Sequence, residues 1–332
     1  ITQSINPRQV GRELGVKHIL KGKVRRLGNQ VRISVRLINV KSGDHLRAER
    51  FDRPIDDLFE ILDELVSRIV GTIVGRVEAA EMAEARRKRP EDMTAYDYLL
   101  RGLEHHRLGG VTLDTVREAV KWYNRAIAAD PNYGVAYAWQ VCASSSLPNF
   151  NLEEGIKNIQ KSTELDENEA HRIMGSIQML SRDFEASEYH HRRAMELNPS
   201  DVYIKARSAA FYTYKGEPTR STELIEAAVA QDPFLPVWCI EERGVALFAL
   251  GRFAEALSAL GAMPFQTFRS RCYEAACRVS MNDQVGAKQA ISKALQIHPT
   301  LTASEFRHRE TYKDLNQASH LSDLLISAGL PK

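Results

Sequence analysis

The residues best suited to chemistry in this chain are two histidine pairs and two closely spaced cysteines. His105–His106 and His190–His191 each set two imidazoles side by side, and Cys272 and Cys277 lie five residues apart. Imidazole and thiolate are common ligands of zinc and other transition metals. Neighbouring residues of a helix point about 100° apart, however, so adjacent histidines rarely share one ion. The two cysteines have no nearby cysteine or histidine to complete a ligand set. We therefore expect no metal site, and packing or surface roles for all six side chains.

Motifs of the common enzyme classes are also absent from the sequence. The glycines form neither a Walker loop nor a dinucleotide-binding loop, and no GxSxG or HExxH motif occurs. No combination of acid, base and nucleophile stands out. We therefore expect this segment to have no catalytic residues and to bind no cofactor.

The composition is that of an ordinary globular protein, with 43% hydrophobic and 27% charged residues. No run of about 18 apolar residues is present, so we expect no membrane span. Four cysteines without a CxxC pair favour reduced thiols and a cytoplasmic location. Because the chain begins at Ile1 rather than methionine, we expect it to be part of a longer protein.

The charge is divided unequally along the chain. Residues 1–56 contain 13 Lys and Arg against 5 Asp and Glu, whereas the remaining residues contain 32 against 38. Two parts of opposite charge indicate two different modules. In the first module, alternating apolar residues and turn signals predict a small α/β domain over 1–56. An apolar stripe then predicts a long helix within 57–90 that packs on the sheet and links the modules. The expected elements of the first module are a short helix at 7–14, closed by Gly15, and strands at 18–25, 30–40 and 45–51.

One face of the predicted sheet is expected to be basic. Alternation along the strands assigns five cations to this face: Lys21, Lys23, Arg32, Arg36 and Arg47. Such a face could bind an acidic partner, or it could simply be solvated. Aromatic residues do not alternate with these charges, so we expect no binding of nucleic acid.

A helical pattern that ends in proline recurs through the rest of the chain. Ala119, Tyr123 and Ala126 place small, large and small side chains on one helical face, and Pro131 then ends the helix. The same spacing returns in three later segments, 187–199, 221–233 and 287–299. Small residues at fixed spacing allow two helices to approach closely, and a bulky neighbour fills the gap between them.

This pattern resembles the tetratricopeptide repeat, a helix-turn-helix unit of about 34 residues. The resemblance implies five to six such helical pairs over 91–299, stacked into an α-α superhelix, followed by a capping helix within 300–332. The fold class expected is therefore mostly α, with a small α/β sheet domain in front of a solenoid.

The run from Val10 to Val70 shows a second resemblance. It is similar to the second part of a TolB-type amino-terminal α/β domain, which precedes tetratricopeptide repeats in the carboxy-terminal region of many bacterial class III adenylate or guanylate cyclase proteins. It also occurs in some winged-helix transcriptional regulators. The family's domain opens with another strand and helix that this sequence lacks. The sheet is therefore expected to be incomplete, with an edge at which two copies could pair as a homodimer.

The tetratricopeptide resemblance also implies where a partner would bind. In that family the first helix of each pair lines a concave groove that holds a protein or peptide. Aromatic residues suit such a groove, because they provide contact area at a low entropic cost. The same side chains could instead pack against neighbouring repeats or the tail. The groove residues implied by the resemblance are Tyr96, Tyr137, Arg172, Tyr203, Trp238, Glu241 and Phe248.

Together, these features predict a non-catalytic regulatory scaffold for protein–protein interaction. The resemblance suggests the carboxy-terminal part of an adenylate cyclase-like signalling protein whose catalytic domain lies outside this segment. The alternative is the sensor portion of a winged-helix transcriptional regulator.

Overall fold

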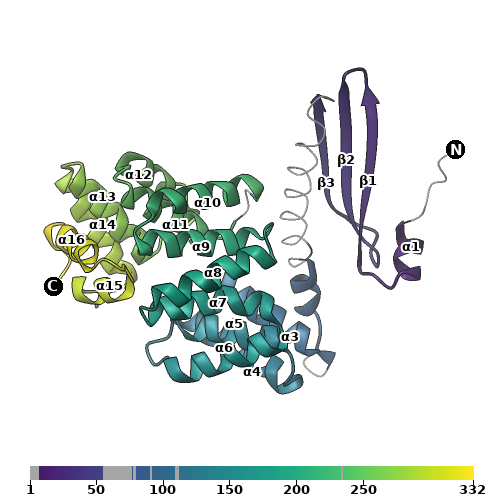
Figure 1. Ribbon diagram of the computed structural model, residues 1–332, viewed down its shortest axis with the longest axis horizontal. Coiled ribbons are helices and arrows are strands. Elements are labelled where there is room, and N and C mark those ends of the chain that lie inside the picture. Colours follow the sequence, from purple (N-terminus) through teal and green to yellow (C-terminus); the bar gives the residue numbers. More distant parts are fainter. Residues whose placement is uncertain (1–6, 55–76, 78–79, 90–91, 109–111, 233–234) are drawn as a thin grey trace. The chain divides into compact units, whose positions relative to one another are not determined.

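Two units make up the chain, one on each side of the Asp92–Met93 bond. The structure is a computed structural model that describes residues 7–54, 77, 80–89, 92–108, 112–232 and 235–332. Figure 1 shows its helices and strands. Each unit is described by itself below.

The N-terminal unit contains a short helix and a three-stranded antiparallel sheet. Helix α1 ends at Gly15, whose φ of 66° is favourable for glycine. The strand order is β1-β2-β3, and the two-residue turn between β1 and β2 has Gly28 at φ 63°. Strand β1 is two residues longer than the sequence predicted and β3 is three residues longer, whereas β2 is one residue shorter. The elements are α1 (Pro7–Glu13), β1 (His18–Leu27), β2 (Gln30–Asn39) and β3 (His45–Pro54).

The predicted long helix falls mostly outside the described residues. Residues 57–76 are not described, and residues 80–85 are helical. The described helical part ends at Ala85, within the predicted range of 57–90.

The C-terminal unit begins with six antiparallel helix hairpins stacked in sequence order. Within each hairpin and between neighbouring hairpins the helices are in contact. The first helices are α3 (Ala95–Leu103, continued by the π-helix η3, Glu104–Leu108), α5 (Gly134–Ser144), α7 (Glu167–Leu180), α9 (Val202–Lys215), α11 (Val237–Ala249) and α13 (Phe268–Ser280). The second helices are α4 (Leu113–Ala129), α6 (Leu152–Leu165), α8 (Phe184–Leu197), α10 (Pro218–Gln231), α12 (Phe253–Gly261) and α14 (Gln284–Ile297).

Small residues bring the two helices of a hairpin together, as the spacing predicted. A methyl group added to Gly175 would lie 2.8 Å from the His191 ring, and one added to Gly102 would lie 2.3 Å from the Tyr123 ring. The Ser187 hydroxyl of α8 also donates a hydrogen bond of 2.7 Å to the backbone carbonyl of Gly175 in α7. The large residue of the second helix therefore fills the space that a glycine of the first helix leaves.

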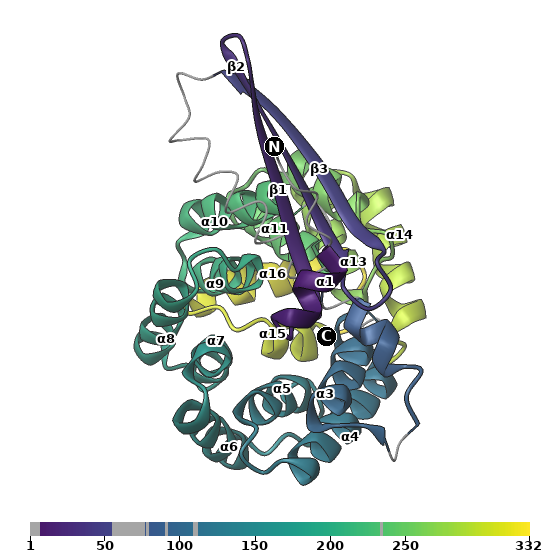
Figure 2. The same cartoon turned by 90° about the vertical axis from the view of Figure 1, so that its right-hand side faces the viewer.

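The stack curves so that the first helix of each hairpin lies on the inside. Figure 2 looks into this curve, with α3, α5, α7, α9, α11 and α13 on the inner side and α4, α6, α8, α10 and α14 outside them. We call the surface formed by the six first helices the inner face.

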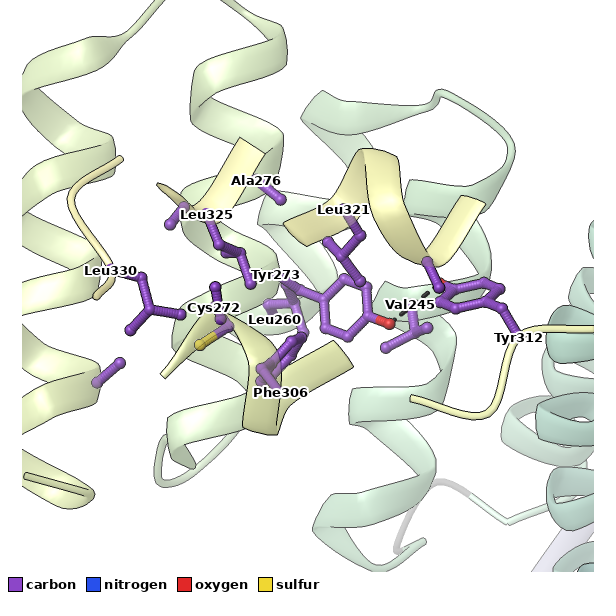
Figure 3. Packing of buried hydrophobic residues seen from close by; sticks show 14 of the residues in the cluster. Val245, Leu260, Cys272, Tyr273, Ala276, Phe306, Tyr312, Leu321, Leu325 and Leu330 are labelled. Atoms are coloured by element: carbon purple, nitrogen blue, oxygen red, sulfur yellow. Dashed lines mark hydrogen bonds between the residues drawn. The ribbon is translucent and has the colours of Figure 1, made fainter. Parts of the chain in front are cut away.

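The tail forms two helices instead of the single predicted capping helix. They are α15 (Ala303–Arg309) and α16 (Leu315–Ser327), separated by the non-helical residues 310–314. Both lie on the inner side of the curve at its C-terminal end, and α16 contacts α13 (Figure 2). Phe306, Leu321 and Leu325 converge on Tyr273 of α13 (Figure 3), and each of these four side chains is at most 2% exposed. The tail thus caps the last hairpin and is part of the main hydrophobic core.

Candidate partner-binding face

The C-terminal part of the inner face holds a buried network centred on Arg269. Its guanidinium group donates hydrogen bonds to Glu241 at 3.0 Å and to Glu242 at 3.1 Å, both on α11. It also binds Glu310 of the tail at 2.7 Å and the Tyr214 hydroxyl of α9 at 2.5 Å. One arginine therefore binds three carboxylates, two from α11 and one from the tail.

Burial and Arg269 act against each other on the pKa values of these carboxyl groups. Burial alone would raise the pKa of Glu310, but Arg269 and hydrogen bonds from Tyr214 and Tyr273 lower it. Burial prevails for Glu242, whose pKa is raised despite Arg269. The pKa values of Glu310 and Glu242 are thus shifted in opposite directions, although both carboxyl groups are bound by Arg269.

The tail crosses the inner face as a non-helical segment. Arg182, in the turn between α7 and α8, donates a hydrogen bond of 2.8 Å to the Tyr312 carbonyl. The Lys313 amide donates one of 2.8 Å to the Tyr214 carbonyl at the end of α9. The Tyr312 hydroxyl lies 3.0 Å from that of Tyr273. Residues 310–313 thus occupy part of the inner face that the sequence assigned to a partner.

Two predicted groove residues lie in this occupied part. Glu241 is 7% exposed and bound to Arg269, and its carboxylate also accepts a hydrogen bond from Thr267. The Phe248 ring packs against Tyr273, with ring centroids 5.3 Å apart. Both side chains therefore contribute to internal packing.

The structure contradicts a groove role for Tyr137 and Arg172. Tyr137 is 8% exposed, and its hydroxyl accepts a 2.7 Å hydrogen bond from Lys161 of α6, in the same hairpin. Arg172 is 3% exposed and donates hydrogen bonds of 3.0 and 2.8 Å to Glu169. Its guanidinium group lies over the Trp139 ring at 4.6 Å. Both predictions were wrong because these side chains are taken up by contacts within the stack, Tyr137 with α6 of its own hairpin and Arg172 with Trp139 of the preceding one.

Three predicted groove residues keep exposed surface. Tyr96 is 39% exposed, and Tyr203 and Trp238 are half-buried. Trp238 stacks against Arg207 of the preceding hairpin, with the guanidinium carbon 4.2 Å from the ring centroid. This pair resembles the Arg172–Trp139 pair two hairpins earlier. Sequence reasoning missed Arg207, although it follows Arg172 by 35 residues, close to one repeat length.

The adjacent histidines point to different surroundings, as helical geometry predicts. His190 Nδ1 lies 2.8 Å from Nδ1 of His171, whereas His191 is fully buried and stacks on Phe211 with centroids 4.9 Å apart. Burial lowers the pKa of His190 to about 4 and that of His191 to about 3. Among the described residues, no group of three His, Cys, Asp or Glu side chains could hold a metal ion.

These lowered pKa values predict a loss of stability in mild acid. The unfolded chain binds protons at histidine below a pH of about 6.5, whereas the folded chain binds them only near the lowered values. Stability should therefore fall from about pH 6.5 towards pH 3, by up to about 1.4 kcal/mol per pH unit for His191. Urea unfolding at pH 7 and pH 5 measures this loss.

The matched control is His191→Ile, because Ile225 and Ile291 occupy the same repeat position in two other hairpins. Isoleucine fills the space beside Gly175 and removes a ring nitrogen, Nε2, that has no hydrogen-bond partner among the described residues. This variant should lose less stability between pH 7 and pH 5 than the unchanged protein. An equal loss would contradict the assignment.

The sheet register places four of the five predicted cations on one face. Lys21 is directly opposite Arg36, and residues opposite each other share a face. By alternation Lys23 and Arg32 lie on the same face. Arg47 does not: it is opposite Leu37 and in phase with the buried Phe51, four residues further along β3. The prediction for Arg47 was wrong because Arg47 and Phe51 are four residues apart on β3, and residues an even number apart in a strand lie on the same face of the sheet.

The same face carries two further arginines and an acidic residue that the sequence did not single out. Arg25 is opposite Arg32, and Arg50 is opposite Ser34. Hydrogen bonds from Arg32 and Arg50 lower the pKa of Asp52 to about 2. Asp52 thus offsets part of the positive charge on β2 and β3.

A hollow of about 480 Å³ lies elsewhere in the N-terminal unit, between the sheet and the described helical residues 80–85. Its charged side chains are paired. Lys17 lies 3.3 Å from Glu81, and Lys41 lies 3.0 Å from Glu84. Each pair joins one positive and one negative side chain, so these four residues give the hollow no net charge that would attract an ionic ligand.

Comparisons with known proteins agree with the helical fold and add one relative. No protein-family model matches the chain. "Putative adenylate cyclase 3" of Rhizobium meliloti (strain 1021) is 35% identical over 135 residues, which are 40% of this chain. The matched region spans 22% of the length of that relative.

Two solved structures illustrate the similarity of fold. The APC/C hetero-tetramer Cut9–Hcn1 matches 76% of this chain and 45% of its own, with a TM-score of 0.53 and 13% identity. A tetratricopeptide repeat protein from Parabacteroides merdae ATCC 43184 matches 80% of this chain and 98% of its own, with a TM-score of 0.46 and 13% identity. The chain is thus mostly helical, with a small antiparallel sheet and a solenoid resembling tetratricopeptide repeat proteins. Within the described residues, no helix is long and apolar enough to cross a membrane.

Proposed function

We propose that residues 93–332 are a scaffold whose inner face binds a segment of a partner protein, and that they have no catalytic role. The observation that carries this proposal is the half-buried surface of Tyr203 and Trp238 on α9 and α11. Figure 2 shows α9 and α11 on the inner side of the curve, whereas Tyr273 of α13 is covered by Phe306 and Tyr312 of the tail. Large aromatic residues of this kind commonly dominate the energy of a protein interface.

We further propose that the parent protein is an adenylate cyclase-like signalling protein of the bacterial cytoplasm, with its chemistry outside this segment. The support is the similarity of 135 residues to a protein described as a putative adenylate cyclase. This similarity favours the cyclase over the winged-helix regulator.

For the N-terminal unit we propose a TolB-like domain whose basic face binds an acidic surface. The support is the cluster of Lys21, Lys23, Arg25, Arg32 and Arg36 on one face of β1 and β2. The same charges act against the homodimer suggested by the sheet edge. If two β1 strands paired with their basic faces aligned, lysines and arginines would lie opposite one another, which is destabilising.

The scaffold function can be tested with the double variant Trp238→Ala, Tyr203→Ala. Affinity purification of the full-length protein from its own cells should recover proteins that the double variant loses, because interface tryptophans and tyrosines often contribute about 2 kcal/mol or more each. Arg243→Ala is the control, since Arg243 lies on α11 but is paired with Glu226 of α10 at 2.7 Å. Identical sets of proteins from the double variant and the unchanged protein would contradict the proposal.

A further inference from the structure

Three arginines of the inner face differ in whether the chain supplies a carboxylate for them. Arg172 is bound by Glu169, and Arg269 is bound by Glu241, Glu242 and Glu310. Arg207 of α9 forms no salt bridge with any carboxylate of the described residues. Its guanidinium group is instead held over the Trp238 ring at 4.2 Å.

Arg207 and Arg172 both act on the buried His191 and help to lower its pKa, after the larger effect of burial. Arg207 also acts to lower the pKa of Glu242, against the larger raising effect of burial. Glu242 is already held by Arg269, at 3.1 and 3.3 Å. A positive charge therefore remains on this part of the inner face without a dedicated internal partner.

The tail shows how this inner face binds an acidic side chain. Glu310 belongs to a non-helical segment, and its carboxylate is bound by Arg269 at 2.7 Å. The hydroxyls of Tyr214 and Tyr273 each donate a further hydrogen bond of 2.6 Å to it. Glu310 is thus held by one arginine and two tyrosines from the first helices of two hairpins, α9 and α13.

A similar set of side chains is present around Arg207 without such an occupant. Tyr203 precedes Arg207 by four residues on α9, so both side chains lie on the same side of that helix. Trp238 of α11 supports the guanidinium plane from the next hairpin. A guanidinium group fixed on an indole ring keeps its planar fork in one orientation, which suits bidentate binding of a carboxylate.

We infer that Arg207, Trp238 and Tyr203 bind the carboxylate of an Asp or Glu residue in an extended segment of the partner protein. This inference rests on the proposed scaffold function and specifies the partner chemically. The carboxylate pairs with Arg207, and the neighbouring residues of the segment pack on the exposed surface of Trp238 and Tyr203. The partner is thus a segment with at least one acidic residue beside apolar or aromatic ones.

Two fluorescein-labelled octapeptides test the inference with the complete chain. One alternates glutamate with tyrosine, and the other alternates glutamine with tyrosine. Fluorescence anisotropy should show the glutamate peptide binding about tenfold more tightly than the glutamine peptide, because a hydrogen-bonded charge pair replaces a neutral contact. Arg207→Gln should remove this difference. Arg207→Lys should keep only part of it, since lysine retains the charge but not the planar fork.

The control is Arg243→Gln, which changes an arginine on α11 that is already paired with Glu226 and should leave binding unchanged. The inference is overturned if the two peptides bind equally, if Arg207→Gln binds the glutamate peptide normally, or if that peptide does not bind at concentrations up to about 1 mM. Its failure can be distinguished from failure of the scaffold function. Natural partners that depend on Trp238 and Tyr203 but not on Arg207 would contradict only the carboxylate site.

Discussion

Replacing Arg269 with leucine is expected to lower the free energy of unfolding of the C-terminal hairpins by about 3–5 kcal/mol. The guanidinium group is the common partner of Glu241, Glu242 and Glu310, and its side chain is 16% exposed. Without it, three buried carboxyl groups would repel one another and lose their strongest hydrogen bonds. Urea unfolding followed by hydrogen exchange in α11 and α13 measures the loss.

Two comparisons separate this effect from the general cost of losing an arginine. Arg252→Leu removes an exposed pair with Glu255 and should change stability little. Glu242→Gln should also cost less than Arg269→Leu, because it leaves Arg269 bound to Glu241 and Glu310. Similar losses for Arg269→Leu and Arg252→Leu would contradict a central role for Arg269.

Ending the chain at Pro299 is expected to unfold α13 and α14. The deletion removes large apolar side chains, each at most 3% exposed, from the main core: Leu301, Phe306, Tyr312, Leu321, Leu325 and Leu330. Each contributes about 1.5–3 kcal/mol when fully buried, so their sum is comparable with the whole stability of a typical domain. Because each hairpin contacts mainly its neighbours, α3 to α8 should keep their structure.

Hydrogen exchange detected by mass spectrometry tests this prediction helix by helix. Amide protection should be lost in α13 and α14 and retained in α3 to α8. Two point variants of α16 provide the matched comparison: Leu325 is 0% exposed and Leu315 is 56% exposed. Leu325→Ala should weaken protection in α13, whereas Leu315→Ala should not. Unchanged protection of α13 in the shortened chain would show that the tail is not a structural cap.

The sequence predicted the hairpins well because their signals are local. The spacing of Ala119, Tyr123 and Ala126 followed by Pro131 corresponds to a helix, α4, that ends two residues before the proline. Glycine and bulky residues 16 to 21 positions apart meet within one hairpin, as Gly175 and His191 or Gly102 and Tyr123 do. Such contacts repeat with the chain and can be recognised from spacing alone.

The path of the tail could not be predicted in the same way. The hydrogen bond between Arg269 and Glu310 spans 41 residues, and that between Arg182 and Tyr312 spans 130. No local pattern indicates that a non-helical segment crosses the inner face and covers part of it. Glu241, which the sequence assigned to a partner groove, is instead bound by Arg269 and Thr267 of this chain.

The measurement that tests the central claim most directly is site-specific photo-crosslinking of the full-length protein in its own cells. A photoreactive phenylalanine analogue is placed either at Trp238, which contacts Arg207 of the inner helix α9, or at Arg243, which contacts Glu226 of the outer helix α10. We predict crosslinks to a partner protein from position 238 and none from position 243. Equal crosslinking from both positions, or crosslinking from position 243 alone, would contradict a partner site on the inner face.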